Sequence, residues 1–414
     1  MTLAPILTDL LGDDLPVGIR TYSGEAIGPE APPAALVVRS PDALRRILFA
    51  PGEMGFARAY VAGDIDFEGD IHLLLRSLRE RLPEVRLTPR QWVRLAEELG
   101  ARQLRPLPPP PEEIRLRGRR HSKGRDASAV TAHYDVSNDF YRLLLGPALT
   151  YSCAVFGTPE TPLEEAQAAK HELICRKLGL QPGMRVLDIG CGWGSFAIHA
   201  ARHHGVSVVG VSLSEPQIDL ARKRVAEGGL TDVVDLRVQD YREIEETGFD
   251  AIASVGMAEH VGPALGDYTR VVHGLLAPGG RYLHHSIAAA GPEGDRRWRP
   301  TMPSFIDRYV FPDSHLHRIG TSVSALEAAG LEVRHVESLR EHYALTLKRW
   351  TGNLEEHWEE AVGHIGPARA RIWHLYLAAC VLVFEIGHVQ VHQVLTVRPA
   401  DGDAGLPLRL GFED

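Results

Sequence analysis

The 414-residue sequence contains few cysteines, and none of them forms a C-x-x-C pair. The four cysteines are Cys153, Cys175, Cys191 and Cys380. Small secreted domains rely on many disulfides, so four scattered thiols in a long chain are typical of a reducing compartment. We therefore expect free thiols rather than a disulfide framework, and chemically inert side chains at Cys175 and Cys191.

Histidines are numerous, yet their spacing lacks the pattern of a zinc site. The sequence has 20 histidines. The clustered ones, His203 with His204 and His315 with His317, have no further ligands at the short intervals that zinc sites use. We therefore expect no metal in this protein.

The sequence also lacks a long uninterrupted apolar run. Its most apolar late stretch, Ile372 to Val397, is broken by His374, Glu385 and His388. A helix that spans a bilayer needs about 20 predominantly apolar residues, so this stretch favours a buried amphipathic helix instead. The opening segment, residues 1–16, has no basic stretch followed by an apolar core, and we expect no secretory leader there.

Positive charge is in the minority. The formal net charge of −9 disfavours a nucleic-acid-binding protein. The exception is the segment from Arg102 to Arg125, where only Glu112 and Glu113 oppose the cations. This basic segment is either a solvated linker or a contact for anionic lipid headgroups, and we favour the lipid contact; it lacks the interleaved aromatics of a nucleic-acid site. Its cations include Arg105, Arg115, Arg117, Arg119, Arg120 and Lys123.

Sequence patterns divide the chain into three parts. Residues 1–105 form a predicted α+β domain that faces lipid or a partner, residues 106–127 a proline-rich and basic linker, and residues 128–414 the catalytic domain. In the first part we predict a strand over 35–39 and helices over 41–48, 71–81 and 88–99. Ser40 is the predicted N-cap of the first of these helices, with Pro41 at its first position.

From Leu163 onward, strand and helix patterns alternate. Such alternation predicts an α/β fold with a mostly parallel sheet and helices on both faces. The predicted strands cover residues 185–189, 206–211, 233–238, 251–255 and 281–287. The predicted helices cover residues 163–178, 195–204, 214–227 and 268–276, with Ser214 and Gln217 as a capping box. From Ser324 to the end we expect mainly helices.

A glycine-rich turn follows the first strand of this region. The strand ends at Asp188, and Gly190, Gly192 and Gly194 then recur at every second position. Glycines permit positive φ and a close approach to a ligand, and the helix that follows offers unpaired N–H groups. The G-x-G-x-G spacing differs from the G-x-G-x-x-G of dinucleotide enzymes and resembles the loop of class I methyltransferases that binds S-adenosylmethionine (SAM).

Two further strand ends support this interpretation. The second strand ends in Ser212-Leu213-Ser214, without the acidic residue that normally holds a ribose, which counts against a nicotinamide enzyme. Asp240 falls at the end of the third strand, where a carboxylate can accept a hydrogen bond from an adenine amino group. Both features favour SAM over a dinucleotide.

Four motifs make a family recognisable. They are residues 133–141 (HYDVSNDFY), 149–154 (LTYSCA), 257–262 (MAEHVG) and 305–312, which contains Phe305-Ile306 and Tyr309 to Pro312. With the glycine loop, this succession resembles the cyclopropane-fatty-acid-phospholipid synthases and the related mycolic acid cyclopropane synthases, over about residues 128–397. The first part matches only in layout, since synthases that act on phospholipids carry an extra N-terminal domain.

The resemblance implies a fold and a reaction. The fold is a class I SAM methyltransferase sheet with helical additions. An acyl-chain alkene attacks the SAM methyl group, and the resulting carbocation loses a proton to close a cyclopropane. Because a side-chain base could be alkylated, the base in related synthases is a bound bicarbonate. The matching SAM-contacting positions are Tyr151, Ser152, Asp188, Gly190, Gly192, Gly194, Leu213, Gln217 and Asp240.

The resemblance also assigns the reaction site. Glu259 and His285 would orient bicarbonate through charge-assisted hydrogen bonds, and Tyr343 would donate to it and face the cation with its ring. The matching positions are Cys153, Glu259, His285, Ile287, Tyr343 and Cys380, with backbone N–H donors at Cys153 and Ile287. His284 and His285 face opposite sides of a strand, and the resemblance selects His285.

Each of these residues also has a purely structural interpretation. Glu259 could complement a helix dipole, and Tyr343 could be a core tyrosine whose hydroxyl needs a partner. A nucleophilic role for Cys153 is disfavoured because no cationic residue lies beside it in sequence to lower its pKa.

The resemblance leaves the product and some partners open. Ala258 stands where the family often has a bulky residue, and the same cation can lose another proton to give a methylene-branched chain, which a partner reductase would then convert.

The expected partners are unsaturated phospholipid and an anionic membrane surface, with a homodimer left open and no nucleic acid. The expected location is cytoplasmic, at the inner face of the membrane. A non-catalytic lipid-binding protein and a methyltransferase for a small heteroatom acceptor are the more distant alternatives.

Overall fold

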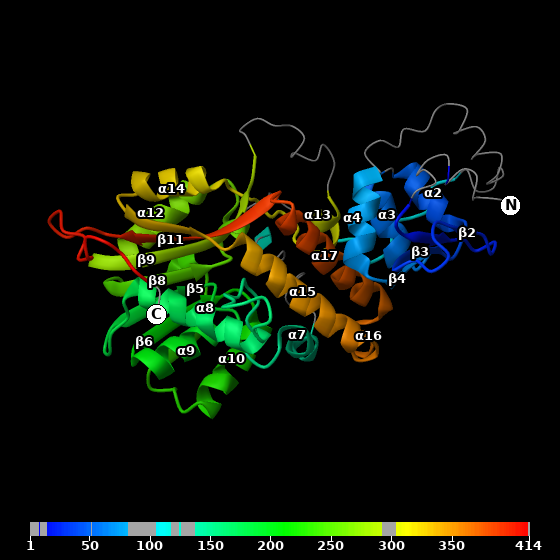
Figure 1. Cartoon of the computed structure of the whole chain (residues 1–414). Coiled ribbons are helices and arrows are strands. Elements are labelled where there is room, and N and C mark those ends of the chain that lie inside the picture. Colours follow the sequence, from blue (N-terminus) through cyan, green and yellow to red (C-terminus); the bar gives the residue numbers. More distant parts are fainter. Residues whose placement is uncertain are drawn as a thin grey trace. The chain divides into compact units, whose positions relative to one another are not determined.

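The computed structural model describes residue 8 and residues 15–50, 52–81, 105–116, 124–125, 137–291 and 304–412. It groups the chain into two compact units (Figure 1). The first unit contains Met1–Arg115, Pro300–Val310 and Trp358–Leu382, and the second contains Leu116–Arg299, Phe311–His357 and Val383–Asp414. The units therefore do not follow the order of the chain, since two late segments join the N-terminal part. The predicted helix over 88–99, residues 102–104 and 117–123 of the basic segment, and residues 133–136 lie outside the described residues.

The first unit has the α+β composition expected of the N-terminal part. Its sheet has the order β2-β1-β3-β4, where β1 and β3 are parallel. The strands are β1 (Gly18–Arg20), β2 (Ala26–Ile27), β3 (Ala34–Val38) and β4 (Ile65–Gly69). The helices are α2 (Asp42–Phe49), α3 (Glu53–Val61), α4 (Ile71–Arg81), α13 (Phe305–Tyr309), α16 (Trp358–Ile365) and most of α17 (Pro367–Glu385). Pro41 is the N-cap of α2 rather than its first residue, while the Ser40 hydroxyl accepts from the Asp42 N–H at 3.0 Å.

Buried polar contacts join the late helices to the N-terminal part of this unit. The Tyr60 hydroxyl lies 2.8 Å from Nδ1 of His374 in α17. Arg371, also in α17, donates to the carbonyls of Tyr60 and Ile65 and to the Asp66 carboxylate. His374, one of the polar residues that interrupt the apolar stretch after Ile372, therefore has a partner inside a folded unit, as a buried helix requires.

The second unit is built on a seven-stranded sheet with the order β10-β11-β9-β8-β5-β6-β7. Strands β9, β8, β5, β6 and β7 are parallel, and β11 pairs antiparallel with both β9 and β10. The strands are β5 (Arg185–Ile189), β6 (Ser207–Ser212), β7 (Val234–Val238), β8 (Phe249–Val255), β9 (Leu276–Ala289), β10 (Glu332–Ser338) and β11 (Val389–Val397).

Helices cover both faces of this sheet. Figure 1 shows α8, α9 and α10 on one side and α12 and α14 on the other. Successive side chains of β5 point to opposite faces of the sheet, so each face has an apolar surface for helices to cover. Val186 packs into the core with α8 to α10, while Leu187 and Ile189 pack into the core with α12. The helices are α7 (Asn138–Leu145), α8 (Leu163–Leu178), α9 (Ser195–His204), α10 (Glu215–Glu227), α11 (Ala258–Val261), α12 (Leu265–Leu275), α14 (Ile319–Ala328) and α15 (Arg340–Glu356).

The α/β fold is confirmed, and α8, β5 and α9 coincide with their predicted bounds. The helix-rich prediction after Ser324 was incomplete, because it missed β10 and β11. The prediction of one helix over Ile372 to Val397 was wrong in its second half, where β11 pairs with β9 from Arg281 to Ala289. Within the described ranges, none of the helices is long and apolar enough to cross a membrane.

Candidate functional site

A cavity of about 400 Å³ opens at the carboxyl ends of the parallel strands. Open α/β sheets bind ligands at this edge. All of the predicted SAM-contacting residues except Gly194 line it: Tyr151, Ser152, Asp188, Gly190, Gly192, Leu213, Gln217 and Asp240. The structure thus gathers residues from several strand ends and from the turn before α8 around one space.

The three glycines of the loop serve two purposes. Gly190, Gly192 and Gly194 have φ values of 83°, 54° and 75°, a region that side chains rarely adopt. Gly190 and Gly192 line the cavity. Gly194 instead caps α9 at a packed position, where a Cβ atom would lie 3.0 Å from Leu236 and 3.3 Å from Ala221. Gly194 therefore shapes the loop without facing the cavity.

Asp188 places a buried carboxylate in the cavity wall. Burial raises the pKa of Asp188 to about 7, and the nearby Lys170 opposes that rise. Its Oδ2 atom is buried and has no hydrogen-bond partner among the described residues. Lys170 also lines the cavity; its ammonium donates to the Ser152 hydroxyl at 3.0 Å, and burial lowers its pKa to about 8. An unpartnered buried carboxylate fits a ligand that carries a cationic group.

Residues at the ends of β6 and β7 make side-chain contacts that the sequence did not predict. The Asp240 carboxylate pairs with the Arg242 guanidinium at 2.6 Å, so an adenine amino group would share it with this cation. Ser214 caps α10 by accepting from the Gln217 N–H. The Gln217 side chain does not complete the capping box, because its Oε1 accepts from the Ser212 hydroxyl at 3.2 Å, which keeps the amide at the cavity wall.

A second carboxylate is buried in a short helix whose neighbouring residues line the cavity. Glu259 is in the short helix α11 between Met257 and His260, which both line the cavity. Its Oε1 accepts from the Ile287 N–H at 2.6 Å, and its buried Oε2 has no hydrogen-bond partner in the part of the chain that the structure describes. Burial raises the pKa of Glu259 to about 7. The Ile287 N–H, expected to donate to bicarbonate, therefore donates to Glu259.

The two adjacent histidines of β9 have different surroundings. The ring nitrogens of His284 lie 3.0 Å from the Tyr282 hydroxyl and 3.0 Å from the Ser286 hydroxyl, so both are engaged within one strand face. His285 faces the other way, and its Nδ1 lies 3.2 Å from Nε2 of Gln393 in β11. Burial lowers the pKa of both rings, so both are neutral.

A buried lysine sets the orientation of His285. The Lys177 ammonium donates to Oε1 of Gln393 at 2.7 Å. The Gln393 amide nitrogen must then face His285 and donate to its Nδ1. Neutral His285 consequently carries its proton on Nε2 and offers that N–H as a donor. Lys177 and Gln393 form a relay of hydrogen bonds to His285, and the sequence analysis missed both.

Backbone contacts bring Cys153 and Tyr343 to the same sheet edge. The Cys153 thiol and the Tyr343 N–H both donate to the carbonyl of Leu339. The Leu339 N–H in turn donates to the carbonyl of Val391, and Val391 pairs with Ile287. This chain of contacts links four predicted reaction-site residues: Cys153, Glu259, Ile287 and Tyr343. Burial raises the pKa of the Cys153 thiol, which opposes a nucleophilic role.

Aromatic rings connect the cavity with Tyr343. Tyr151, in the cavity wall, lies 5.3 Å from Trp350, and Trp350 lies 6.1 Å from Tyr343 between ring centroids. Such faces stabilise cations and exclude water. Cys380, by contrast, lies buried in α17 and belongs to the first unit; its place in the reaction site stays a prediction.

Comparisons with known proteins point to one family. The sequence model of the mycolic acid cyclopropane synthetase family matches residues 121–394. A probable fatty acid methyltransferase of Mycobacterium tuberculosis is 42% identical over 95% of this chain and 94% of its own length. The cyclopropane-fatty-acyl-phospholipid synthase of Escherichia coli is 34% identical over 92% of each chain. A crystal structure of a mycolic acid cyclopropane synthase complexed with SAH and CTAB superposes with a TM-score of 0.62 at 34% identity, covering 66% of this chain and 98% of that one.

Proposed function

Because the chain belongs to the mycolic acid cyclopropane synthetase family and is a SAM-dependent methyltransferase, we propose that it methylates the double bond of unsaturated phospholipid acyl chains and closes a cyclopropane ring. The observation that carries the proposal is the buried Glu259 carboxylate, with one oxygen held by the Ile287 N–H and the other without a partner among the described residues.

The cavity residues fit SAM by charge and shape. Oδ2 of Asp188, which has no hydrogen-bond partner among the residues that the structure describes, suits the cationic amino-acid part of the donor, and the positive φ values at Gly190 and Gly192 let the backbone approach it. When bound, SAM supplies an electrophilic methyl group. The roles of the chain are to hold the donor at Asp188 and to keep water away from it with apolar and aromatic walls.

The Glu259 site fits bicarbonate. Oε2 of Glu259 has no partner within the described ranges, and neutral His285 carries an Nε2–H donor by the tautomer argument above. When bound, bicarbonate supplies a base that is itself hard to alkylate. Glu259 and His285 would hold and orient it, while the rings of Tyr343 and Trp350 face the positive charge that develops on the acyl chain.

A product analysis tests the proposal directly. The protein is incubated with SAM and vesicles of monounsaturated phospholipid, and the released fatty acids are examined by mass spectrometry and NMR. We expect a mass gain of one methylene together with cyclopropane ring protons. An unchanged acyl chain with every unsaturated phospholipid tried would refute both the cyclopropane proposal and its variant below.

A methylene-branched product is the second candidate. Ala258 is buried beside Glu259, where a small side chain leaves room for the acyl chain to bind in another position relative to the base. Two of the similar proteins are named as probable fatty acid methyltransferases rather than cyclopropane synthases. Vinylic methylene protons in the NMR spectrum would establish this product and imply a partner reductase.

The basic segment is proposed to attach the enzyme to anionic membranes. Replacing Arg115, Arg117, Arg119 and Arg120 by glutamine should weaken sedimentation with anionic vesicles strongly, because each cation near such a surface contributes about 1 kcal/mol. The effect should shrink as salt screens the attraction. A matched control replaces four arginines that are at least 50% exposed elsewhere, Arg39, Arg142, Arg222 and Arg270. Equal sedimentation of both variants would show that the segment is only a linker.

A further inference from the structure

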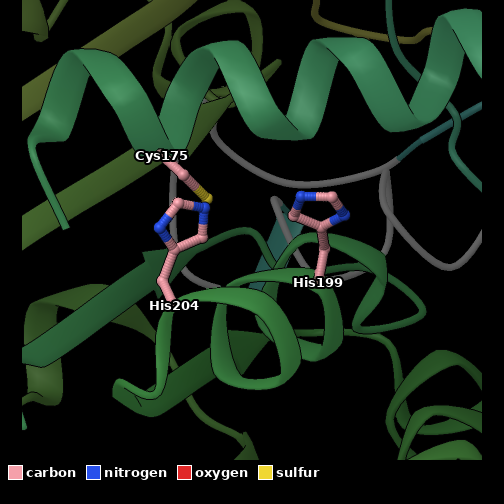
Figure 2. A group of neighbouring side chains, drawn as sticks. All are labelled: Cys175, His199 and His204. Carbon is pink, nitrogen blue, oxygen red and sulfur yellow. The ribbon is translucent and has the colours of Figure 1, made fainter. Parts of the chain in front are cut away.

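Helices α8 and α9 carry a cluster of ligand-type side chains that do not line the cofactor cavity. One ligand atom each of Cys175, His199 and His204 lies within 4.8 Å of the others. Figure 2 shows Cys175 extending from one helix toward the two imidazole rings of the other. The three side chains therefore converge on one space between two helices that pack on the same sheet face.

The chemistry of these groups matches a late transition metal. Thiolate and imidazole are the ligands that zinc prefers, at about 2.3 Å for sulfur and about 2.0 Å for nitrogen. With these bond lengths, ligand atoms in a tetrahedral site lie about 3.3–3.6 Å apart. The observed separations of up to 4.8 Å exceed that range by little more than 1 Å.

A carboxylate completes the cluster. Oε2 of Glu172 lies 3.4 Å from Nε2 of His199 and 3.0 Å from Nε2 of His204. The carboxylate therefore contacts both imidazole rings, the position that acidic groups next to metal-bound histidines commonly take.

Solvent can reach the cluster. The His199 and His204 side chains are 15% and 19% exposed, and Cys175 and His204 border a surface cavity. The thiol itself is buried, and burial raises its pKa, so without a metal it stays protonated. A bound metal would deprotonate it and release that proton to the solvent.

We propose that Cys175, His199 and His204, supported by Glu172, bind a divalent ion of the zinc class that fastens α8 to α9. The sequence analysis expected no metal because Cys175 is separated from His199 and His204 by a strand. The ligands therefore lack the short sequence spacing by which a zinc site is recognised. The consequence concerns the cofactor cavity, since α8 carries Lys170 and α9 begins at the glycine loop. The ion orders these elements and takes no part in methyl transfer.

Cobalt serves as the spectroscopic probe. The full-length protein, freed of any affinity tag and treated with a chelator, is titrated with Co²⁺. We expect a thiolate-to-cobalt charge-transfer band in the near ultraviolet that saturates at one equivalent and disappears when Zn²⁺ is added. Cys175→Ser should abolish the band, and His199→Gln and His204→Gln should each weaken Co²⁺ binding at least about 10–100-fold.

His203→Gln is the matched control, because His203 is an exposed histidine of the same helix. It should bind Co²⁺ like the wild type. A second measurement needs no variant: Zn²⁺ should protect Cys175 of the wild type from alkylation, as followed by mass spectrometry. Absence of the band, its persistence in Cys175→Ser, or unprotected alkylation at saturating Zn²⁺ would each overturn the proposal.

Discussion

Replacing Glu259 by glutamine should remove most of the turnover while leaving SAM binding and the fold intact. Glutamine keeps the shape of the side chain and its acceptor for the Ile287 N–H, but it cannot carry the charge that would orient bicarbonate. General acid–base groups contribute about 10²–10⁴-fold, and we expect a loss of about 10³-fold in kcat with little change in the Kd for SAM. Product formation and SAM titration measure the two effects.

The same substitution should also stabilise the protein above neutral pH. Because burial raises the pKa of Glu259 from 4.5 to about 7, the folded state keeps a proton that the unfolded state has released. Stability from this group is therefore present in acid and is lost as pH rises from about 4.5 to about 7. At pH 9, Glu259→Gln should gain up to about 3 kcal/mol in unfolding free energy, and at pH 4 almost nothing.

A control separates the role of this carboxylate from a general effect of removing charge. Glu341→Gln removes a carboxylate that is 68% exposed, two residues before Tyr343. It should change neither the turnover nor the pH dependence of stability. If Glu259→Gln turned over at the wild-type rate, its assigned place in the reaction site would be wrong, whatever its stability.

The strands were predictable where strand and helix patterns alternate clearly along the sequence. Buried parallel strands such as Arg185–Ile189 lie between glycine turns and well-capped helices, so their bounds follow from local signals. Strand β11 was missed because its nearly continuous burial follows directly on the apolar helix α17, and a run of buried residues has no period that separates helix from strand. Only the pairing with β9 decides its conformation.

The donor side of the site was predictable for a related reason. Asp188, Gly190 and Gly192 directly follow one strand, and Asp240 follows another, so local motifs and the rule for parallel sheets place them at one edge. The orientation of His285 was not predictable. It depends on Gln393 and Lys177, which are 108 and 108 residues away in opposite directions and meet it only after β11 has paired with β9.

Asp188→Asn should weaken SAM binding by about 30-fold or more while leaving the protein folded. The Oδ2 atom of Asp188 is buried in the cavity wall and has no partner in the described part of the chain, so a cationic ligand group would find its counter-charge there. Removing one partner of a buried charge pair costs about 2–5 kcal/mol, which corresponds to about 30-fold to several thousand-fold in Kd. Isothermal titration with SAM measures the effect.

The pH dependence of SAM affinity tests whether the charge of Asp188 is responsible for SAM binding. Because the pKa of Asp188 is about 7 in the free protein, the ionised form that binds a cation gains population as pH rises toward 7. Wild-type affinity for SAM should therefore increase between pH 5.5 and 7.5, and Asp188→Asn should lose that slope. The control Asp267→Asn removes a carboxylate of the same cavity that is 73% exposed, and it should retain both the affinity and the slope. Equal losses in the two variants would mean that the overall field of the cavity, rather than the buried carboxylate, attracts the donor.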